Sequence, residues 1–186
     1  MRKSFLITLV MLCSGLGVSA QGLRITLNGV NYETLTDTTA QVAASQANGD
    51  VIIAPHVKIK RKIYKVVALA PEAFAASSPG AGISSIQLPN TLETIGESAF
   101  KETALAKIDI PSGVAQIGDM AFYNCKNLKE VQLSTSLKSI GYGTFIGCTS
   151  LENVQVPSSV TSIGELAFEA SGLKSISLPN SVTSIG

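Results

Sequence analysis

The stretch LENVQVPSSVTSIGELAFEASG, residues 151–172, is followed directly by LKSISLPNSVTSIG, residues 173–186, which begins a second copy of the same motif. Aligned on their first leucine or isoleucine, five such units follow one another at steps of 22, 23, 23 and 22 residues. A fixed period of this size is typical of a solenoid, in which each unit forms one coil and stacks on its neighbours. The units begin at Ile83, Leu105, Leu128, Leu151 and Leu173.

The first half of each unit carries three apolar residues, and the last two of them are spaced by two positions. This spacing predicts a short strand that turns one face to a core. In four units a proline follows and ends the strand, because proline cannot donate a hydrogen bond to a sheet; Ser134 takes that place in the third unit. The triplets are Ile83/Ile86/Leu88, Leu105/Ile108/Ile110, Leu128/Val131/Leu133, Leu151/Val154/Val156 and Leu173/Ile176/Leu178.

The second half of each unit carries an Ile-Gly pair and, in all but the last unit, a phenylalanine four residues after the glycine. We expect the glycine to serve a bend with unusual backbone angles and the aromatic ring to fill the space between the two walls of the coil. The segment around Ala-Phe is expected to form a short helical turn. The phenylalanines are Phe100, Phe122, Phe145 and Phe168.

This pattern of Leu-x-x-Ile-x-Leu-Pro and then Val-x-x-Ile-Gly-x-x-Ala-Phe, with Cys or Ser before the next Leu, resembles the BspA-type leucine-rich repeat of bacterial surface proteins. The resemblance covers residues 83–186, and a weaker unit, YKVVALAPEAF at residues 64–74, precedes them. It implies a right-handed, β-rich leucine-rich-repeat solenoid with short helical turns. It also implies binding and adhesion at the bacterial cell surface without a common catalytic residue.

Three segments are expected along the chain: a signal peptide at 1–20, a β cap at 21–66 and the solenoid at 67–186. In the cap, LRITLNGVNYETLT places Asn28-Gly29 between alternating apolar positions, which predicts a hairpin. NGDVIIAP and VKIKRKIYKVV predict a further turn and strands that cover the open edge of the first coil.

The first twenty residues have the parts of a secretory signal: Arg2 and Lys3, an apolar run from Phe5 to Leu12, and small residues up to Ala20. The apolar run is too short for a permanent membrane-spanning helix. We expect cleavage after Ala20 and a secreted or surface-exposed bacterial protein that does not insert into the membrane. An alternative is lipidation at Cys13, but Leu12 stands where that processing needs a small residue.

The composition excludes several classes of function. With 14 Lys and Arg against 13 Asp and Glu, the chain has no charge excess that would attract nucleic acid. The single histidine, His56, is far in sequence from Cys125 and Cys148, so no catalytic constellation, zinc site or cofactor site is indicated. We expect a protein that is not an enzyme and that uses no cofactor or metal.

Cys125 and Cys148 occupy the same position of successive units, so they are expected to stack about 4.8 Å apart on neighbouring coils. That spacing admits a disulfide in an exported protein. We favour reduced thiols, because stacked parallel side chains point the same way and Thr103 and Ser171 stand at the same position in adjacent units.

An acidic column is expected from Glu97, Asp119 and Glu165, which follow the Ile-Gly pairs. It is consistent with calcium binding, but Tyr142 interrupts it. We favour the capping of short helical turns by these acids.

Two surfaces are candidates for binding. The stretch KIKRKIYK, residues 58–65, is either a solvated hairpin tip, which we favour, or a patch for an anionic ligand; its basic residues are Lys58, Lys60, Arg61, Lys62 and Lys65. The stronger candidate is the solvent side of the strands, where two polar columns without aromatic residues are expected. The columns are Ser85, Lys107, Glu130, Asn153 and Ser175, and Gln87, Asp109, Gln132, Gln155 and Ser177.

We therefore expect a non-catalytic adhesion or interaction module that binds a protein or a cell-surface glycan through the solenoid surface. The alternative is a structural spacer that supports another domain of a longer surface protein. The last unit stops at Ile185-Gly186 without its Ala-Phe segment. We expect the natural chain to continue; the alternatives are fraying of the last coil and association through its open edge.

Overall fold

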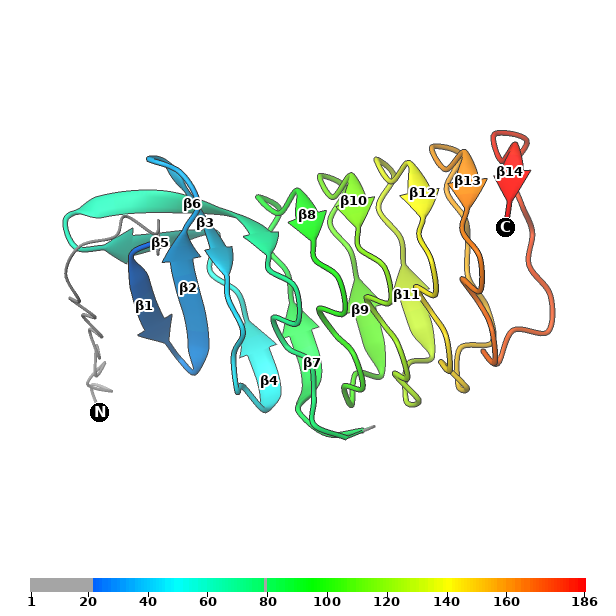
Figure 1. Ribbon diagram of the computed structural model, residues 1–186, viewed down its shortest axis with the longest axis horizontal. Coiled ribbons are helices and arrows are strands. Elements are labelled where there is room, and N and C mark those ends of the chain that lie inside the picture. The colour runs from blue at the N-terminus through cyan, green and yellow to red at the C-terminus, as the bar shows by residue number, and fades with distance from the viewer. Residues whose placement is uncertain (1–21, 79) are drawn as a thin grey trace, which may run out of the picture.

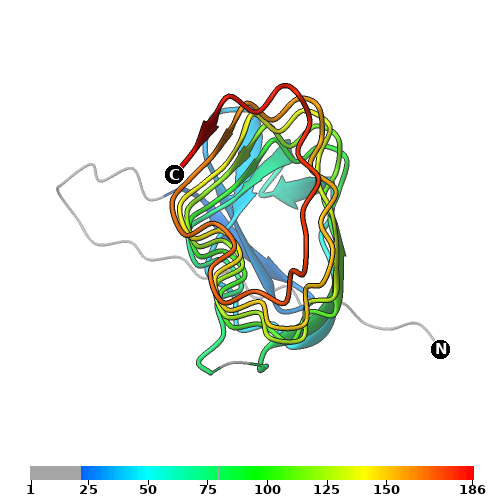
Figure 2. The ribbon, with the colours of Figure 1, turned by 90° about the vertical axis from the view of Figure 1, so that its right-hand side faces the viewer.

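The computed structural model describes residues 22–78 and 80–186, so the expected signal peptide lies outside the described residues. The chain winds into coils that follow one another along the long axis of the molecule (Figure 1). Viewed along that axis, the coils superpose closely around a common interior (Figure 2). The molecule is a β-solenoid, as the repeat period predicts.

The expected strands of the triplets lie on one wall of the solenoid, as two parallel pairs that we together call the first sheet. Its strands are β4 (Gly49–Ile52), β7 (Ile83–Gln87), β9 (Lys107–Asp109) and β11 (Glu130–Gln132). β4 pairs with β7, and β9 with β11, in parallel, while Gln155 and Ser177 form a parallel bridge in the last two coils. The parallel register stacks equivalent residues of successive units in columns.

The Ile-Gly segments line the other wall of the coil as two runs of parallel strands, divided after residue 117, that we together call the second sheet. Its strands are the end of β6 (Lys62–Leu69), then β8 (Thr94–Ile95), β10 (Gln116–Ile117), β12 (Ser139–Ile140), β13 (Ser162–Ile163) and β14 (Ser184–Ile185). Each isoleucine aligns with that of a neighbouring coil, as Ile95 does with Ile117. Leu69 of β6 pairs with Ile95, so the weaker unit is also in register.

The predicted phenylalanine filling of the core is confirmed. Phe74, Phe100, Phe122, Phe145 and Phe168 form one continuous stack, with ring centroids 5.9, 5.2, 5.3 and 5.5 Å apart and planes within 13° of parallel. The three central rings are fully buried, whereas Phe168 is half-buried. Each ring therefore packs against its equivalents on the coils above and below.

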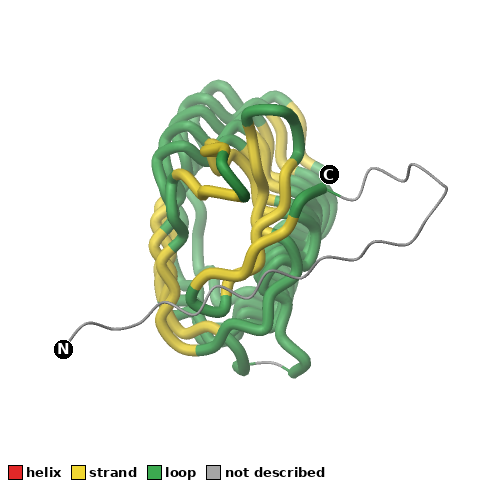
Figure 3. The backbone as a smooth tube through the Cα atoms, turned by 90° about the vertical axis from the view of Figure 1, so that its left-hand side faces the viewer, coloured by secondary structure: helices red, strands yellow, loops and turns green. Residues whose placement is uncertain are grey.

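The expected short helical turns do not form; residues 22–78 and 80–186 contain strands, turns and loops only (Figure 3). After each glycine the chain makes two tight turns with positive φ, as at Ser98 (53°) and Glu102 (62°). Alternate N–H groups of these segments donate to the next coil, whereas those between them donate within the turn, as Ala99 N does to Gly96 O at 3.3 Å. Phe100 N donates to Ala121 O at 2.8 Å and Phe122 N to Thr144 O at 3.0 Å. Bonding between coils thus replaces part of the bonding that a helix would make within itself.

We call the outer surface of these segments the turn face; it comprises residues 97–102, 119–124, 142–147 and 165–170. The positive-φ positions align on it in two columns. The first contains Glu72, Ser98, Met120, Gly143 and Leu166, and the second contains Glu102, Asn124, Gly147 and Ala170.

The glycine of the Ile-Gly pair is required for a different reason from the one predicted. Gly96, Gly118, Gly141 and Gly164 do not have positive φ. A Cβ at Gly164 would lie 2.8 Å from Tyr142 N and 2.9 Å from Gly141 C, both in the backbone of the preceding coil. Close approach of adjacent coils, and not an unusual backbone angle, therefore excludes a side chain here.

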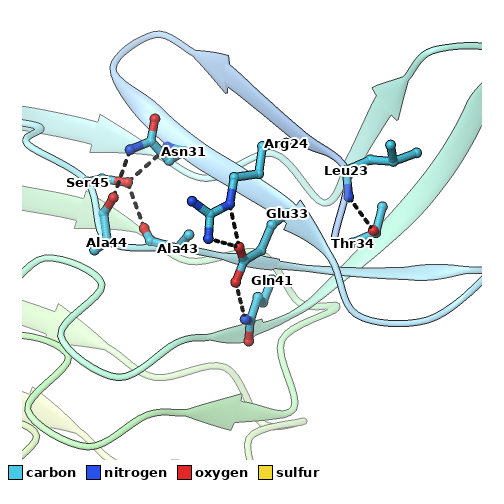
Figure 4. Close-up of polar contacts among 9 residues, drawn as sticks. All are labelled: Leu23, Arg24, Asn31, Glu33, Thr34, Gln41, Ala43, Ala44 and Ser45. Atoms are coloured by element: carbon cyan, nitrogen blue, oxygen red, sulfur yellow. Dashed lines mark hydrogen bonds and ion pairs between the residues drawn. The ribbon is translucent and has the colours of Figure 1, made fainter. Parts of the chain in front are cut away.

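The N-terminal segment contains the predicted hairpin, in which β1 (Arg24–Leu27) pairs antiparallel with β2 (Val30–Thr34). Its turn residues Asn28 and Gly29 have φ of 50° and 79°, as a tight hairpin turn requires. On β2, Glu33 accepts hydrogen bonds from Arg24 and, at 2.6 Å, from Gln41 (Figure 4). These contacts tie the hairpin to the next strand.

Coil geometry begins earlier in the chain than the repeats indicate. β3 (Thr39–Val42) is antiparallel to β2 but parallel to β6, and β4 is parallel to β7. β5 (His56–Ile59) and the start of β6 form a second hairpin. Residues 39–53 thus share the parallel pairing of the later coils, although they lie inside the expected cap; the capping role of residues 21–66 stays a prediction.

Candidate ligand-binding face

The two polar columns expected on the solvent side of the first sheet are exposed at all of their positions. Between them, Ile108, Val131 and Val154 are buried, as the alternation predicts. The register places Lys107 beside Glu130 and Asp109 beside Gln132. We call this surface the strand face.

A fixed cation lies at the centre of the strand face. Lys107 Nζ is 3.6 Å from Asp109 Oδ1 and 3.4 Å from Glu130 Oε2. The charge of Asp109, and then the hydrogen bond and charge of Glu130, raise the pKa of Lys107, so its ammonium group stays protonated. Because all three groups are well exposed, the pairs contribute little to folding, and their charges are accessible to a ligand.

The strand face extends further towards the N-terminus than the sequence analysis indicated. Asp50 aligns with Ser85 and Ile52 with Gln87, so β4 adds a member to each column. Asp50 Oδ1 accepts a hydrogen bond of 2.6 Å from Ser85 Oγ. Ile52 is 70% exposed and gives the face the large apolar side chain that its other coils lack. The likeness of DVIIAP, residues 50–55, to SIQLP, residues 85–89, could have indicated this alignment.

Two pockets lie at the two ends of the strand face. One of about 360 Å³ is lined by Ile52, Gln87, Leu88 and Pro89 among others. The other, of about 430 Å³, is lined by residues of the last two coils, including Asn153, Gln155, Ser175 and Ser177. The polar columns run between these pockets along the solenoid axis.

The basic residues of 58–65 lie on the β5–β6 hairpin, are all exposed and divide between its two sides. Lys58 pairs across the hairpin with Ile63 on its outer side. Lys62 lies on the other side, with its ammonium group 5.7 Å from the centre of the Tyr64 ring. Lys65 Nζ forms an ion pair of 2.8 Å with Glu93 of the next coil. The solvated hairpin tip, which we favour, and the patch for an anionic ligand both stay predictions.

Cys125 and Cys148 are buried free thiols, as we favoured, and not a disulfide. Each donates to a phenylalanine carbonyl of the preceding coil, Cys125 to Phe100 O at 2.9 Å and Cys148 to Phe122 O at 3.1 Å. Burial raises the pKa of Cys125 to about 11 and raises that of Cys148 further. Protonated, enclosed thiols of this kind are structural and unreactive.

The acidic column does not cap helices, since these segments form none. Asp119 Oδ1 instead accepts a hydrogen bond of 3.0 Å from Tyr142 N on the next coil. In the part of the chain that the structure describes, no three His, Cys, Asp or Glu side chains are grouped to hold a metal ion. The same residues contain no helix long and apolar enough to span a membrane.

The repeat geometry agrees with a comparison against protein families. The profile described as "BspA type Leucine rich repeat region" matches residues 69–186 in six copies. The chain belongs to the BspA-type leucine-rich repeat family. No curated protein matches the chain.

Several solved structures share the fold of this BspA-type protein. The leucine-rich repeat protein of T. pallidum is 27% identical with a TM-score of 0.72, over 85% of this chain and 79% of that one. A leucine-rich cell surface protein of Faecalibacterium prausnitzii is 26% identical with a TM-score of 0.65, over 88% of this chain and 50% of that one. The pneumococcal vaccine antigen PcpA, 21% identical with a TM-score of 0.67 over 87% of this chain, shows the fold alone. This chain spans about half the length of the last two proteins.

Proposed function

We propose that this protein is a non-catalytic, exported interaction module that binds a protein or a cell-surface glycan through the strand face. The observation that carries the proposal is the pair of exposed polar columns in register along the solenoid. Membership of the BspA-type family and likeness to a bacterial cell surface protein support a surface location. The signal-peptide pattern of residues 1–20 supports export.

The columns suit a ligand that lies along the solenoid axis. Adjacent coils present equivalent side chains about 4.8 Å apart, so an extended chain contacts several coils at once. Amide and hydroxyl groups such as Gln132, Gln155 and Ser177 offer donors and acceptors, and Lys107 offers a fixed positive charge. Ile52 adds an apolar contact at one end. Many modest contacts of this kind give specificity through their spacing.

The second candidate is a spacer that presents another domain of a longer surface protein. What favours it is the absence of aromatic residues from the two columns, since binding energy is usually concentrated in buried aromatic and arginine side chains. A hydrated ladder of amides and hydroxyls would also keep a spacer soluble.

Replacement of the central strand-face residues separates the two functions. In the variant Lys107→Ser/Asp109→Ser/Glu130→Ser/Gln132→Ser, we expect binding to arrayed extracellular-matrix proteins or glycans to weaken by about tenfold or more, equivalent to about 1.4 kcal/mol. The matched control Asp37→Ser/Glu97→Ser/Gln116→Ser/Lys138→Ser changes four exposed residues of the same types away from the strand face and should bind as the unchanged protein does. If the strand-face variant binds as well as the control and the unchanged protein do, the result would favour the spacer.

A further inference from the structure

Several large apolar side chains are gathered on the turn face. Tyr142 is 37% and Leu166 43% exposed, and Met120, Tyr123 and Ile146 are half-buried beside them. Hydrogen bonds between coils bring these residues together, for example Met120 N to Tyr142 O at 2.9 Å. Tyrosine, methionine and leucine are side chains that protein-protein contacts use as anchors.

Gly143 widens this apolar surface. It lies between Met120 and Leu166 in the first positive-φ column, with a φ of 58°. A Cβ at Gly143 would lie 2.7 Å from Cδ1 of Ile146, so the missing side chain leaves room for Ile146 to lie against this column. We call Met120, Tyr123, Tyr142, Ile146 and Leu166 the apolar cluster.

Acidic side chains surround the apolar cluster. Asp119 and Glu165 flank Tyr142 on the coils before and after it, Glu165 directly precedes Leu166 in the chain, and Glu169 follows Leu166 by three residues. All three acids are exposed, and none forms an ion pair with any residue that the structure describes. Lys101 lies over the Tyr123 ring, 5.9 Å from its centre. The surface therefore favours a partner with an exposed apolar side chain among positive charges, and it disfavours an anionic membrane.

The same molecule carries a surface of that description on the outer side of the β5–β6 hairpin. Ile63 is 64% exposed and has Lys58 as its direct cross-strand partner. Lys60 and Arg61 form the adjoining turn and are exposed. An apolar side chain bordered by cations is thus complementary to an apolar cluster bordered by acids.

We propose that the protein self-associates, with the outer side of the β5–β6 hairpin of one copy docking on the apolar cluster of a second copy. Ile63 packs against Tyr142 and Leu166, and Lys58 and Arg61 lie opposite Glu165 and Glu169. The hairpin lies towards the N-terminal end of the solenoid and the cluster towards the C-terminal end (Figure 1). A single contact of this kind links copies head to tail, and two reciprocal contacts close an antiparallel dimer. The strand face takes no part, so this contact and ligand binding can fail independently.

Analytical ultracentrifugation of the protein over a range of concentrations and salt tests the proposal. We expect concentration-dependent association that weakens as ionic strength rises, because the charged rims are screened. The variants Lys58→Glu/Arg61→Glu and Glu165→Lys/Glu169→Lys should each weaken association by about tenfold or more, since each places like charges opposite one another. The control Lys129→Glu/Lys138→Glu, which makes an equal charge change elsewhere, should associate as the unchanged protein does.

Mixing the two charge-reversed variants should restore association, because the acidic hairpin of one then meets the basic turn face of the other. Restoration also proves that both variants are folded. A protein that stays monomeric at every concentration overturns the proposal. The apolar cluster would then be a candidate binding site for a different, basic protein. Association that neither charge reversal alters also overturns it, since the copies must then meet elsewhere, for example at a coil edge.

Discussion

The glycines that follow Ile95, Ile117 and Ile163 on the second sheet leave room for the backbone of the preceding coil, whereas at Gly141 the neighbouring group is the Asp119 side chain. At Gly118 a Cβ would overlap the backbone of Gly96 and Glu97. Because that obstacle is backbone and not the end of a flexible side chain, it can move only if the two coils separate. A single methyl group at this point therefore disturbs the spacing on which the pairing of both sheets depends.

Gly118→Ala is expected to lower the free energy of unfolding by about 1–3 kcal/mol, the usual cost of overpacking. Urea denaturation followed by circular dichroism measures it. The control Ser112→Ala alters an exposed residue of the same coil and should change stability by less than about 0.5 kcal/mol. An unchanged midpoint for Gly118→Ala would mean that the coil spacing adjusts freely.

The two buried thiols make stability depend on alkaline pH. Burial raises the pKa of Cys125 from 9.0 to about 11, and it raises the pKa of Cys148 as well. The folded protein therefore holds these protons more tightly than the unfolded chain does. Their contribution to stability is complete below the ordinary thiol pKa and declines as the pH rises towards the folded value.

The free energy of unfolding should thus fall between neutral pH and pH of about 10 by more in the unchanged protein than in Cys125→Ala/Cys148→Ala. Urea titrations of both proteins at the two pH values measure the difference, and the contributions of other titrating groups cancel in the comparison.

Alkylation by iodoacetamide at neutral pH, read at Cys125 and Cys148 by peptide mass spectrometry, should be slow until urea is added. Rapid alkylation of the folded protein would contradict the enclosure of the thiols.

The phenylalanine stack is the element that joins the coils through the interior. Phe122 contacts rings on both sides, at 5.2 and 5.3 Å, whereas Phe168 has one stacking partner at 5.5 Å and is half-buried. The same residue type therefore contributes differently at the two positions.

Phe122→Ala should destabilise the protein by about 3–5 kcal/mol, as removal of a buried aromatic ring does. Phe168→Ala serves as the matched comparison and should cost clearly less, because its ring loses fewer contacts. Chemical denaturation of both variants gives the two values. Equal losses would show that the last coils are packed as tightly as the middle ones.

The repeat predicted the strands and the core, because apolar residues such as Ile108 and Phe122 recur at offsets that only one coil geometry accommodates. It did not predict the turn face. The local pattern around Ala-Phe does not distinguish an N–H that bonds within a helix from one that bonds to the next coil. Gly143 and Gly147 occupy both positive-φ positions of their unit and are the signal for tight turns, but other units place residues such as Ser98 and Leu166 there.

The candidate surfaces were predictable to different degrees. Alternation within one strand identified the exposed positions of Lys107 and Gln132. Asp50 and Ile52 were missed because their unit lacks the repeat spacing and the register shifts between Gly49 and Asp50. The apolar cluster was missed because its residues belong to different coils, and only stacking brings Met120, Tyr142 and Leu166 together.

At the scale of the molecule, neighbouring coils are joined in three regions: the first sheet, the second sheet and the turn face. Between the second and third units, β9 pairs with β11 in the first sheet and Phe122 N donates to Thr144 O at 3.0 Å on the turn face, while the second-sheet pairing of β8 with β10 joins the first and second units. Coils far apart in the chain do not touch in this way. The stability of each coil therefore depends mainly on its contacts with the neighbouring coils.

This arrangement determines how the molecule behaves under tension. A pull on its two ends loads the bonds of the outermost coil first, while the coils behind it stay intact. A coil adds about 4.8 Å to the length of the stacked solenoid. When it peels away, its 22 or 23 residues extend to a segment about 75–80 Å long. A protein built this way and held between two surfaces would lengthen in steps and absorb work at each one, instead of breaking at a single point.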